Sequence, residues 1–151
     1  MSESPKTGAR PAEEEAAAPE AASKVRAEAR EASVALTRRI AALAAEKKAE
    51  DAVALDVRDL VGYTDFLLIV TARNERQAKA IHDEVYARLK QEDGLLPARV
   101  EGAVEARWVL MDYLDCVLHV FVPELRDRYR LEVLWGEAAR LELDPGDETS
   151  P

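Results

Sequence analysis

The sequence predicts an α/β protein with a mixed sheet of about five strands, flanked by helices. Apolar stretches of strand length alternate with segments of helical spacing, and glycine, proline or acidic turns separate them. The chain has 151 residues, which suits one domain with a tail. We predict a domain over 33–143, between disordered low-complexity tails at 1–32 and 144–151, because both tails lack apolar periodicity; the first tail is expected to fray into helix near its end.

The first half of the predicted domain contains a helix, two strands and a second helix. An apolar stripe of helical spacing runs through Leu36, Ile40, Leu43 and Lys47. The segment 52–57 alternates like a half-buried strand, and 66–70 is continuously apolar like a central strand. The second helix is predicted to start at Asn74, a capping residue three positions before Gln77, and to stop at Gly94.

The second half contains three strands and a short helical segment. We expect a short strand at 98–101 and then a hairpin over 106–121. The strand–helix–strand unit over 66–101 should form a right-handed crossover between parallel strands. Pro123 suits the first turn of a helix. Tyr129, Val133 and Leu134, with Leu131 and Trp135 nearby, then suggest another packed turn, stopped by Gly136.

The charge pattern bears on the class of partner. The net charge is −9: residues 1–32 hold five basic and seven acidic side chains, so the rest carries sixteen basic and twenty-three acidic ones. An acidic domain disfavours direct nucleic-acid binding, which needs cations to replace phosphate counterions, and is compatible with a basic protein partner or with solubility alone. No stretch is apolar enough for a membrane span, and a single cysteine makes cytosol the expected compartment.

The hairpin over 106–121 is the most informative segment. It offers an aromatic anchor, Trp108, and an Asp-Tyr-Leu-Asp turn on a rigid sheet, as a protein-binding surface would. On a strand, Trp108 shares one face with Leu110 and Asp112. Trp108 has two interpretations, core packing or an exposed contact with a partner.

Several segments follow one another in a distinctive order and spacing, the densest of which are Ala106–Tyr113, His119–Phe121 and Tyr129–Gly136. Through them the chain resembles the ribosomal silencing factor family, also called the Iojap-like family, over about 36–143. The resemblance implies a nucleotidyltransferase-like fold without catalysis or cofactors. It also implies a translational repressor that binds the fourteenth protein of the large ribosomal subunit and blocks joining of the small subunit when nutrients are short.

The resemblance places Trp108 at the interface with that protein, and we expect its neighbours to take part. The predicted partner-binding residues are Trp108, Leu110, Asp112, Tyr113, Asp115 and Arg76. Arg73 and Arg76 stand where a helix begins, so they form either a solvated loop or a contact with the partner or with nearby ribosomal RNA. An exposed apolar sheet face would also permit a homodimer of the free protein.

Enzymatic interpretations fit the sequence less well. Asp112 and Asp115 are compatible with turn chemistry, with recognition of a basic partner or with acid–base catalysis. A nucleotidyltransferase would need Gly-Ser before paired carboxylates, and Gly-Ser occurs nowhere in the chain. His119 and His82 lack zinc-ligand spacing, so His119 is expected to be a hydrogen-bonded structural residue and Cys116 an inert buried thiol.

Overall fold

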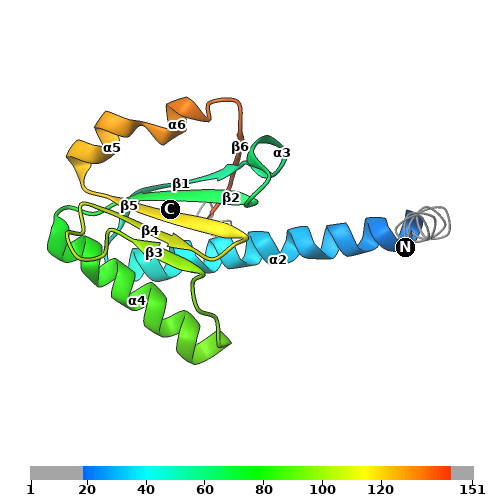
Figure 1. The fold of residues 1–151 in the computed structure, drawn as a ribbon, viewed down its shortest axis with the longest axis horizontal. Coiled ribbons are helices and arrows are strands. Elements are labelled where there is room, and N and C mark those ends of the chain that lie inside the picture. The colour runs from blue at the N-terminus through cyan, green and yellow to red at the C-terminus, as the bar shows by residue number, and fades with distance from the viewer. Residues whose placement is uncertain (1–18, 144–151) are drawn as a thin grey trace, which may run out of the picture. The chain divides into compact units, whose positions relative to one another are not determined.

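The computed structural model describes residues 19–143 (Figure 1). It divides into two units, the first ending at Ala32 and the second starting at Ser33. The elements in chain order are α2 (Pro19–Glu46), β1 (Glu50–Asp56), α3 (Arg58–Val61), β2 (Phe66–Thr71), α4 (Glu75–Asp93), β3 (Arg99–Glu101), β4 (Trp108–Asp112), β5 (Cys116–Phe121), α5 (Pro123–Tyr129), α6 (Leu131–Leu134) and β6 (Ala139–Leu141).

In the described part of the segment 1–32, α2 begins at Pro19, so the helix expected near the end of the tail is present and covers residues 19–32. Residues 19–32 contain mostly Ala, Glu, Lys and Arg, which have high helix propensity, and Pro19 is the only proline among them. An apolar stripe is needed for packing but not for helix formation itself. The predictions for 1–18 and 144–151 lie outside the described residues, and the proposed domain boundaries remain a prediction.

The six strands form one mixed sheet in the order β3-β4-β5-β2-β1-β6. β2 and β5 pair in parallel, and every other neighbouring pair is antiparallel. β3 therefore runs in the same direction as β2, with β4 and β5 between them, so the parallel crossover through α4 is confirmed. The predicted strands are all present, and β6 is an additional edge strand that three residues form against β1.

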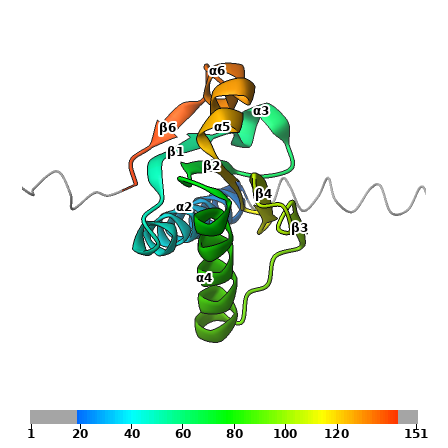
Figure 2. The ribbon, with the colours of Figure 1, turned by 90° about the vertical axis from the view of Figure 1, so that its left-hand side faces the viewer.

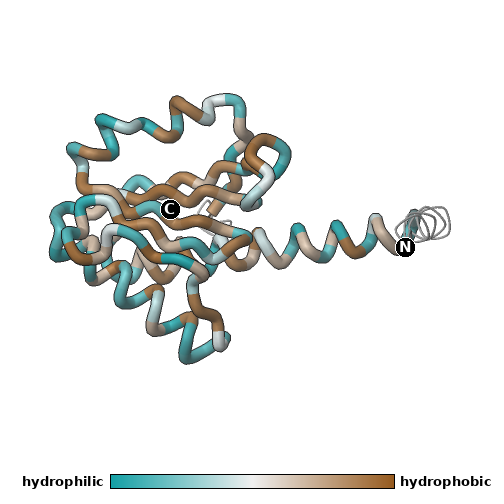
Figure 3. Tube along the Cα trace, viewed as in Figure 1, coloured by the Kyte–Doolittle hydropathy of each residue, from teal (hydrophilic) through white to brown (hydrophobic). Residues whose placement is uncertain are grey.

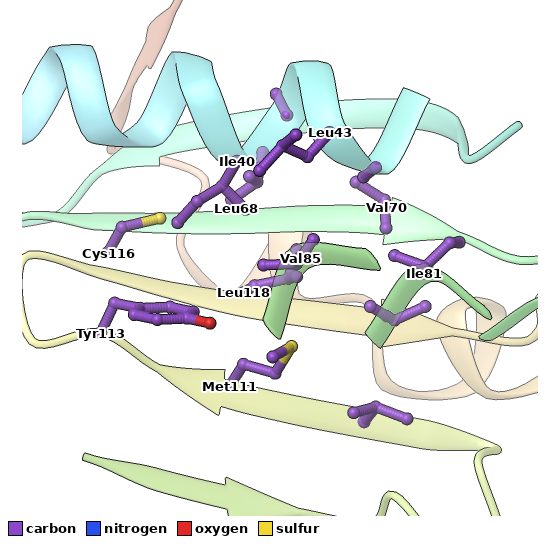
Figure 4. Close-up of a cluster of buried hydrophobic side chains, with 14 of the residues drawn as sticks. Ile40, Leu43, Leu68, Val70, Ile81, Val85, Met111, Tyr113, Cys116 and Leu118 are labelled. Atoms are coloured by element: carbon purple, nitrogen blue, oxygen red, sulfur yellow. The ribbon is translucent and has the colours of Figure 1, made fainter. Parts of the chain in front are cut away.

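One face of the sheet is covered by α4 and by the part of α2 that starts at Ser33 (Figure 2). Its core contains Ile40 and Leu43 from α2 and Ile81 and Val85 from α4, packed on Leu68, Val70, Met111 and Leu118 of the strands (Figure 4). The helical spacing predicted for both helices is confirmed by this burial, and hydropathy alternates along α4 while the central strands are continuously hydrophobic (Figure 3).

The start of α4 is tied to the end of α2. Asn74 caps the helix, since its side chain accepts a hydrogen bond of 2.9 Å from the Gln77 N–H. The Gln77 side-chain oxygen reaches back, as in a capping box, but accepts from the Arg73 N–H one residue before the cap, while its NH₂ group donates to the carbonyls of Lys47 and Lys48, at 3.0 Å each. Gly94 ends the helix in the left-handed conformation, as its position predicts.

The opposite face is covered by α3, α5 and α6 (Figure 2). A second apolar cluster lies there, built on Leu55, Val57, Leu67, Ile69, Val117 and Phe121. Because helices cover both faces, every residue of β2 and β5 is buried. In β4, by contrast, buried and half-exposed residues alternate, so the second helical layer leaves part of this strand open to solvent.

Candidate functional site

The half-exposed side of β4 is the candidate site. Trp108, Leu110 and Asp112 point to this side, while Val109 and Met111 are buried in the core on the other. Strand geometry spaces the first and the last of the three by about 13 Å. We call Trp108, Leu110 and Asp112 the open strip. The edge strand β3 borders it, with Glu101 opposite Leu110 and Arg99 opposite Asp112.

Trp108 lies between the two interpretations that the sequence left open, because its ring is half-buried. Its ring centroid lies 4.7 Å from that of Phe121 and 4.8 Å from that of Tyr129. Its Nε1–H donates a hydrogen bond of 3.0 Å to Nδ1 of His119. The indole is thus held by the fold on one side and open to solvent on the other. This arrangement is typical of residues that anchor protein interfaces.

Gly102 determines where β4 begins. It has a φ of +79°, and a Cβ at this position would lie 2.1 Å from the carbonyl oxygen of Trp108. The Ala106 N–H then donates to the Gly102 carbonyl at 2.8 Å, which closes the loop before the strip. No residue with a side chain fits this close approach, so glycine is required at the turn that positions Trp108.

The turn between β4 and β5 explains Asp112. Its Oδ1 accepts a hydrogen bond of 2.8 Å from the Leu114 N–H, and the Tyr113 N–H donates to the Cys116 carbonyl at 2.9 Å. The turn-chemistry interpretation of Asp112 is therefore confirmed. Recognition of a basic partner by the same carboxylate stays a prediction.

Asp115 lies beyond the strip, at the end of the hairpin. Its backbone carbonyl accepts hydrogen bonds from the N–H groups of Asp65 and Phe66, at 3.3 and 3.1 Å. Partial burial and the nearby Asp65 carboxylate raise the pKa of Asp115. Asp115 is exposed and available for contact, but it is separated from Trp108 by the length of β4.

Tyr113 is the predicted site residue that the structure contradicts. Its side chain is only 3% exposed and belongs to the core beneath α2 and α4, as Figure 4 shows. The strand alternation that places Asp112 on the open side directs the next residue to the other side. Burial raises the pKa of its hydroxyl, so Tyr113 is a core residue and not a surface contact.

Arg76 is exposed in the first turn of α4, separate from the strip. The link between the two regions is Arg107, which lies next to Trp108 in sequence. Its guanidinium contacts the carboxylates of Glu124 at 3.1 Å and Glu75 at 3.8 Å. A shallow pocket at this place is lined by Arg73, Asn74, Glu75, Arg107, Val122, Pro123 and Glu124. Arg76 is not among the residues that line this pocket, so it does not join the strip, and its part in binding stays a prediction.

The titratable residues of β5 are structural. His119 is hydrogen-bonded, as the sequence predicts, and burial lowers its pKa from 6.5 to about 4. Cys116 is fully buried, and burial raises the pKa of its thiol to about 12, in agreement with an inert thiol. Within residues 19–143, no group of three His, Cys, Asp or Glu side chains is arranged to hold a metal ion. No helix in that range is long and apolar enough to cross a membrane.

Tyr129 is a site residue that the sequence did not reveal. Its ring packs on Trp108 while the residue is 47% exposed, so it enlarges the aromatic surface at the end of the strip. The expected packed turn is confirmed for Leu131 and Trp135, which are half-buried against the second apolar cluster. It is wrong for Val133 and Leu134, because both are 68% exposed.

Comparison with known proteins assigns the family. The family model described as "Ribosomal silencing factor during starvation" matches residues 28–151. Ribosomal silencing factors of Halalkalibacterium halodurans and Bacillus subtilis are 43% and 41% identical, over 66% and 70% of this chain and 84% and 89% of theirs. The chloroplastic Iojap protein of Arabidopsis thaliana is 33% identical over 79% of this chain and 49% of its own. A crystal structure of a Bacillus halodurans protein superposes with a TM-score of 0.60 at 39% identity, covering 69% of this chain and 93% of that one. With the fold and the family model in agreement, the chain belongs to the ribosomal silencing factor family.

Proposed function

We propose that this protein represses translation by binding the large ribosomal subunit through its fourteenth protein and sterically blocking the small subunit, notably under nutrient limitation. The observation that carries the proposal is the open strip. Trp108, Leu110 and Asp112 form a half-exposed line on a strand whose other side is buried in the core. A rigid strand that presents an anchored indole loses little entropy on docking.

Charge supports a basic partner. The chain carries a net charge of −9, and the strip ends at Asp112, with Asp115 exposed beyond it. Acidic groups beside an apolar anchor favour a surface that offers Arg or Lys around an apolar patch. Arg76 lies outside the strip, where we propose a peripheral contact with ribosomal RNA.

We also propose that the protein acts by occupancy and not by catalysis, with no cofactor, and that it acts in the cytoplasm. Two facts support this: the chain belongs to the ribosomal silencing factor family, and Asp112 and His119 in the hairpin both make hydrogen bonds within the fold. Asp112 accepts from the backbone of its own turn, and His119 accepts from Trp108. When the ribosome is absent, the same strip can bury its apolar side chains in a homodimer that the ribosome must open.

Sucrose-gradient sedimentation with purified ribosomal subunits tests the proposal. We expect the protein to co-sediment with large subunits and not with small ones, and to reduce joined ribosomes when it is added before mixing. Leu110→Glu should abolish co-sedimentation, because it places a charge in the centre of the strip. Val104→Glu is the matched control, since Val104 is an exposed apolar residue (91%) outside the strip.

Equal binding to both subunits, or to neither, would contradict the proposal. Binding to the large subunit that both variants retain would show that the strip is not the docking surface. Binding without an effect on joining would indicate an adaptor that recognises the subunit without silencing it.

A further inference from the structure

His119 is the only histidine in β5, which contains no acidic residue, and it faces the second helical layer. The strand is buried along its whole length, and His119 itself is 7% exposed. A buried polar group needs a hydrogen-bond partner, because desolvation without one is costly. The partner of Nδ1 is the indole N–H of Trp108, at 3.0 Å.

The strand register produces this contact. Trp108 pairs with Phe121, and Leu110 pairs with His119, so Trp108 and His119 are diagonal neighbours on one face of the β4–β5 hairpin. Because Nδ1 accepts the hydrogen bond from the indole N–H, the neutral imidazole carries its own proton on Nε2. The lowered pKa of His119 agrees with a neutral acceptor at this position.

The hydrogen bond fixes one atom of the indole, whereas the aromatic contacts are less directional. Phe121 and Tyr129 lie against the indole at interplanar angles of 32° and 42°. The torsion χ2, which turns the indole, has broad wells about a half-turn apart. A half-turn would move Nε1 away from His119 and present a different edge of the asymmetric ring to solvent. The hydrogen bond at 3.0 Å therefore favours the observed orientation over the turned one.

We propose that His119 is a positioning residue for partner binding: it selects one orientation of the Trp108 indole in the open strip without touching the partner. The inference rests on the proposed function, in which Trp108 is the anchor. An anchor held in its bound orientation avoids the ordering cost that a freely turning ring would incur on docking.

Two substitutions at His119 test the proposal in a Trp135→Phe background, where Trp108 is the single tryptophan. His119→Asn retains an acceptor oxygen close to the position of Nδ1, whereas His119→Leu has similar bulk and no acceptor. The first readout is the indole N–H signal in a ¹H–¹⁵N correlation spectrum. We expect slow solvent exchange in the parent and in His119→Asn, and fast exchange with a changed shift in His119→Leu.

The second readout is affinity for purified large ribosomal subunits, with a thermal melt as the check on folding. His119→Leu should weaken binding about 3- to 10-fold, the range expected when one neutral hydrogen bond is lost, and His119→Asn should restore most of it. Unchanged affinity in His119→Leu, where Trp108→Ala loses binding, would overturn the positioning role alone. Unchanged affinity in Trp108→Ala would instead overturn the strip itself. Should His119→Leu fail to fold, an indole proton that exchanges at the solvent rate in the parent would still overturn the inference.

Discussion

Truncation of Trp108 to alanine separates binding from folding, and the structure allows both effects to be estimated. A fully buried Trp→Ala change costs about 3–5 kcal/mol of stability. Trp108 is half-buried, so about 2 kcal/mol is expected for its packing on Phe121 and Tyr129. His119 also loses its donor, which adds roughly 0.5–1 kcal/mol. The sum is about 2.5–3 kcal/mol, or a fall of roughly 10 °C in the melting midpoint.

This loss of stability cannot by itself abolish binding. Domains of this size are stable by at least about 5 kcal/mol, so about 2 kcal/mol remains and roughly 97% of the variant is folded at 25 °C. Unfolding therefore reduces the apparent affinity by only a few per cent. A hot-spot Trp contributes about 2–4 kcal/mol to binding, which corresponds to a roughly 30- to 1,000-fold loss of affinity.

The assay combines a circular-dichroism melt with affinity for the isolated fourteenth large-subunit protein. Trp135→Ala is the matched control, since Trp135 is also half-buried in the second apolar cluster but lies outside the strip. We expect both variants to melt at lower temperature and only Trp108→Ala to lose binding. If Trp108→Ala melts lower and binds like the parent, the reasoning is refuted and Trp108 is a core residue only.

Three further predictions follow from the fold. A chain that starts at Ser33 should melt within about 2 °C of the full chain, because the structure divides after Ala32 and residues 1–32 hold too few apolar groups to offset chain entropy; a drop of many degrees would show that the segment packs on the domain. The folded-state pKa of His119, about 4, lies below its ordinary 6.5, so its neutral form stabilises the fold above pH 6.5 and that stability is lost as the pH falls toward 4. Going from pH 7.5 to 5.0 should then cost the parent about 2 kcal/mol more than His119→Asn in urea unfolding, and equal losses would contradict the assignment. Calorimetric titration with magnesium and ATP should give no heat of binding, whereas micromolar affinity would revive a nucleotidyltransferase.

Local signals in the sequence are sufficient for the long elements of the fold. Asn74 and Gly94 mark both ends of α4 because capping chemistry acts within a few residues. The short elements α3 and β6 have no such signal, since four and three residues carry no measurable periodicity. The start of α2 at Pro19 could not be located for a different reason: without an apolar stripe, the composition of residues 19–32 favours helix but does not mark where the helix begins.

The site was predictable as far as strand alternation extends. Alternation places Trp108, Leu110 and Asp112 on one face and Tyr113 on the other, so the error at Tyr113 came from setting alternation aside and choosing a residue for its proximity in sequence. The hydrogen bond between Trp108 and His119 depends on the hairpin register, which makes these two residues diagonal neighbours. Tyr129 could not be found in this way, because only tertiary packing brings α5 over the start of β4.

The central position of β5 has a consequence for how the chain acquires this fold during synthesis. β1 and β2 form one half of the sheet, β3 and β4 form another, and β5 is the strand that joins them. The joining pairs are distant in sequence: Phe66 meets Cys116 in parallel, whereas Trp108 meets Phe121 locally. The hairpin with Trp108 can therefore form as soon as β5 is made. The two halves close into one sheet only when β2 and β5, whose paired residues are 50 positions apart in sequence, have been brought into register. A nascent chain that ends before Cys116 exposes the apolar edge of β2, which makes β5 the segment whose synthesis ends the risk of misassociation.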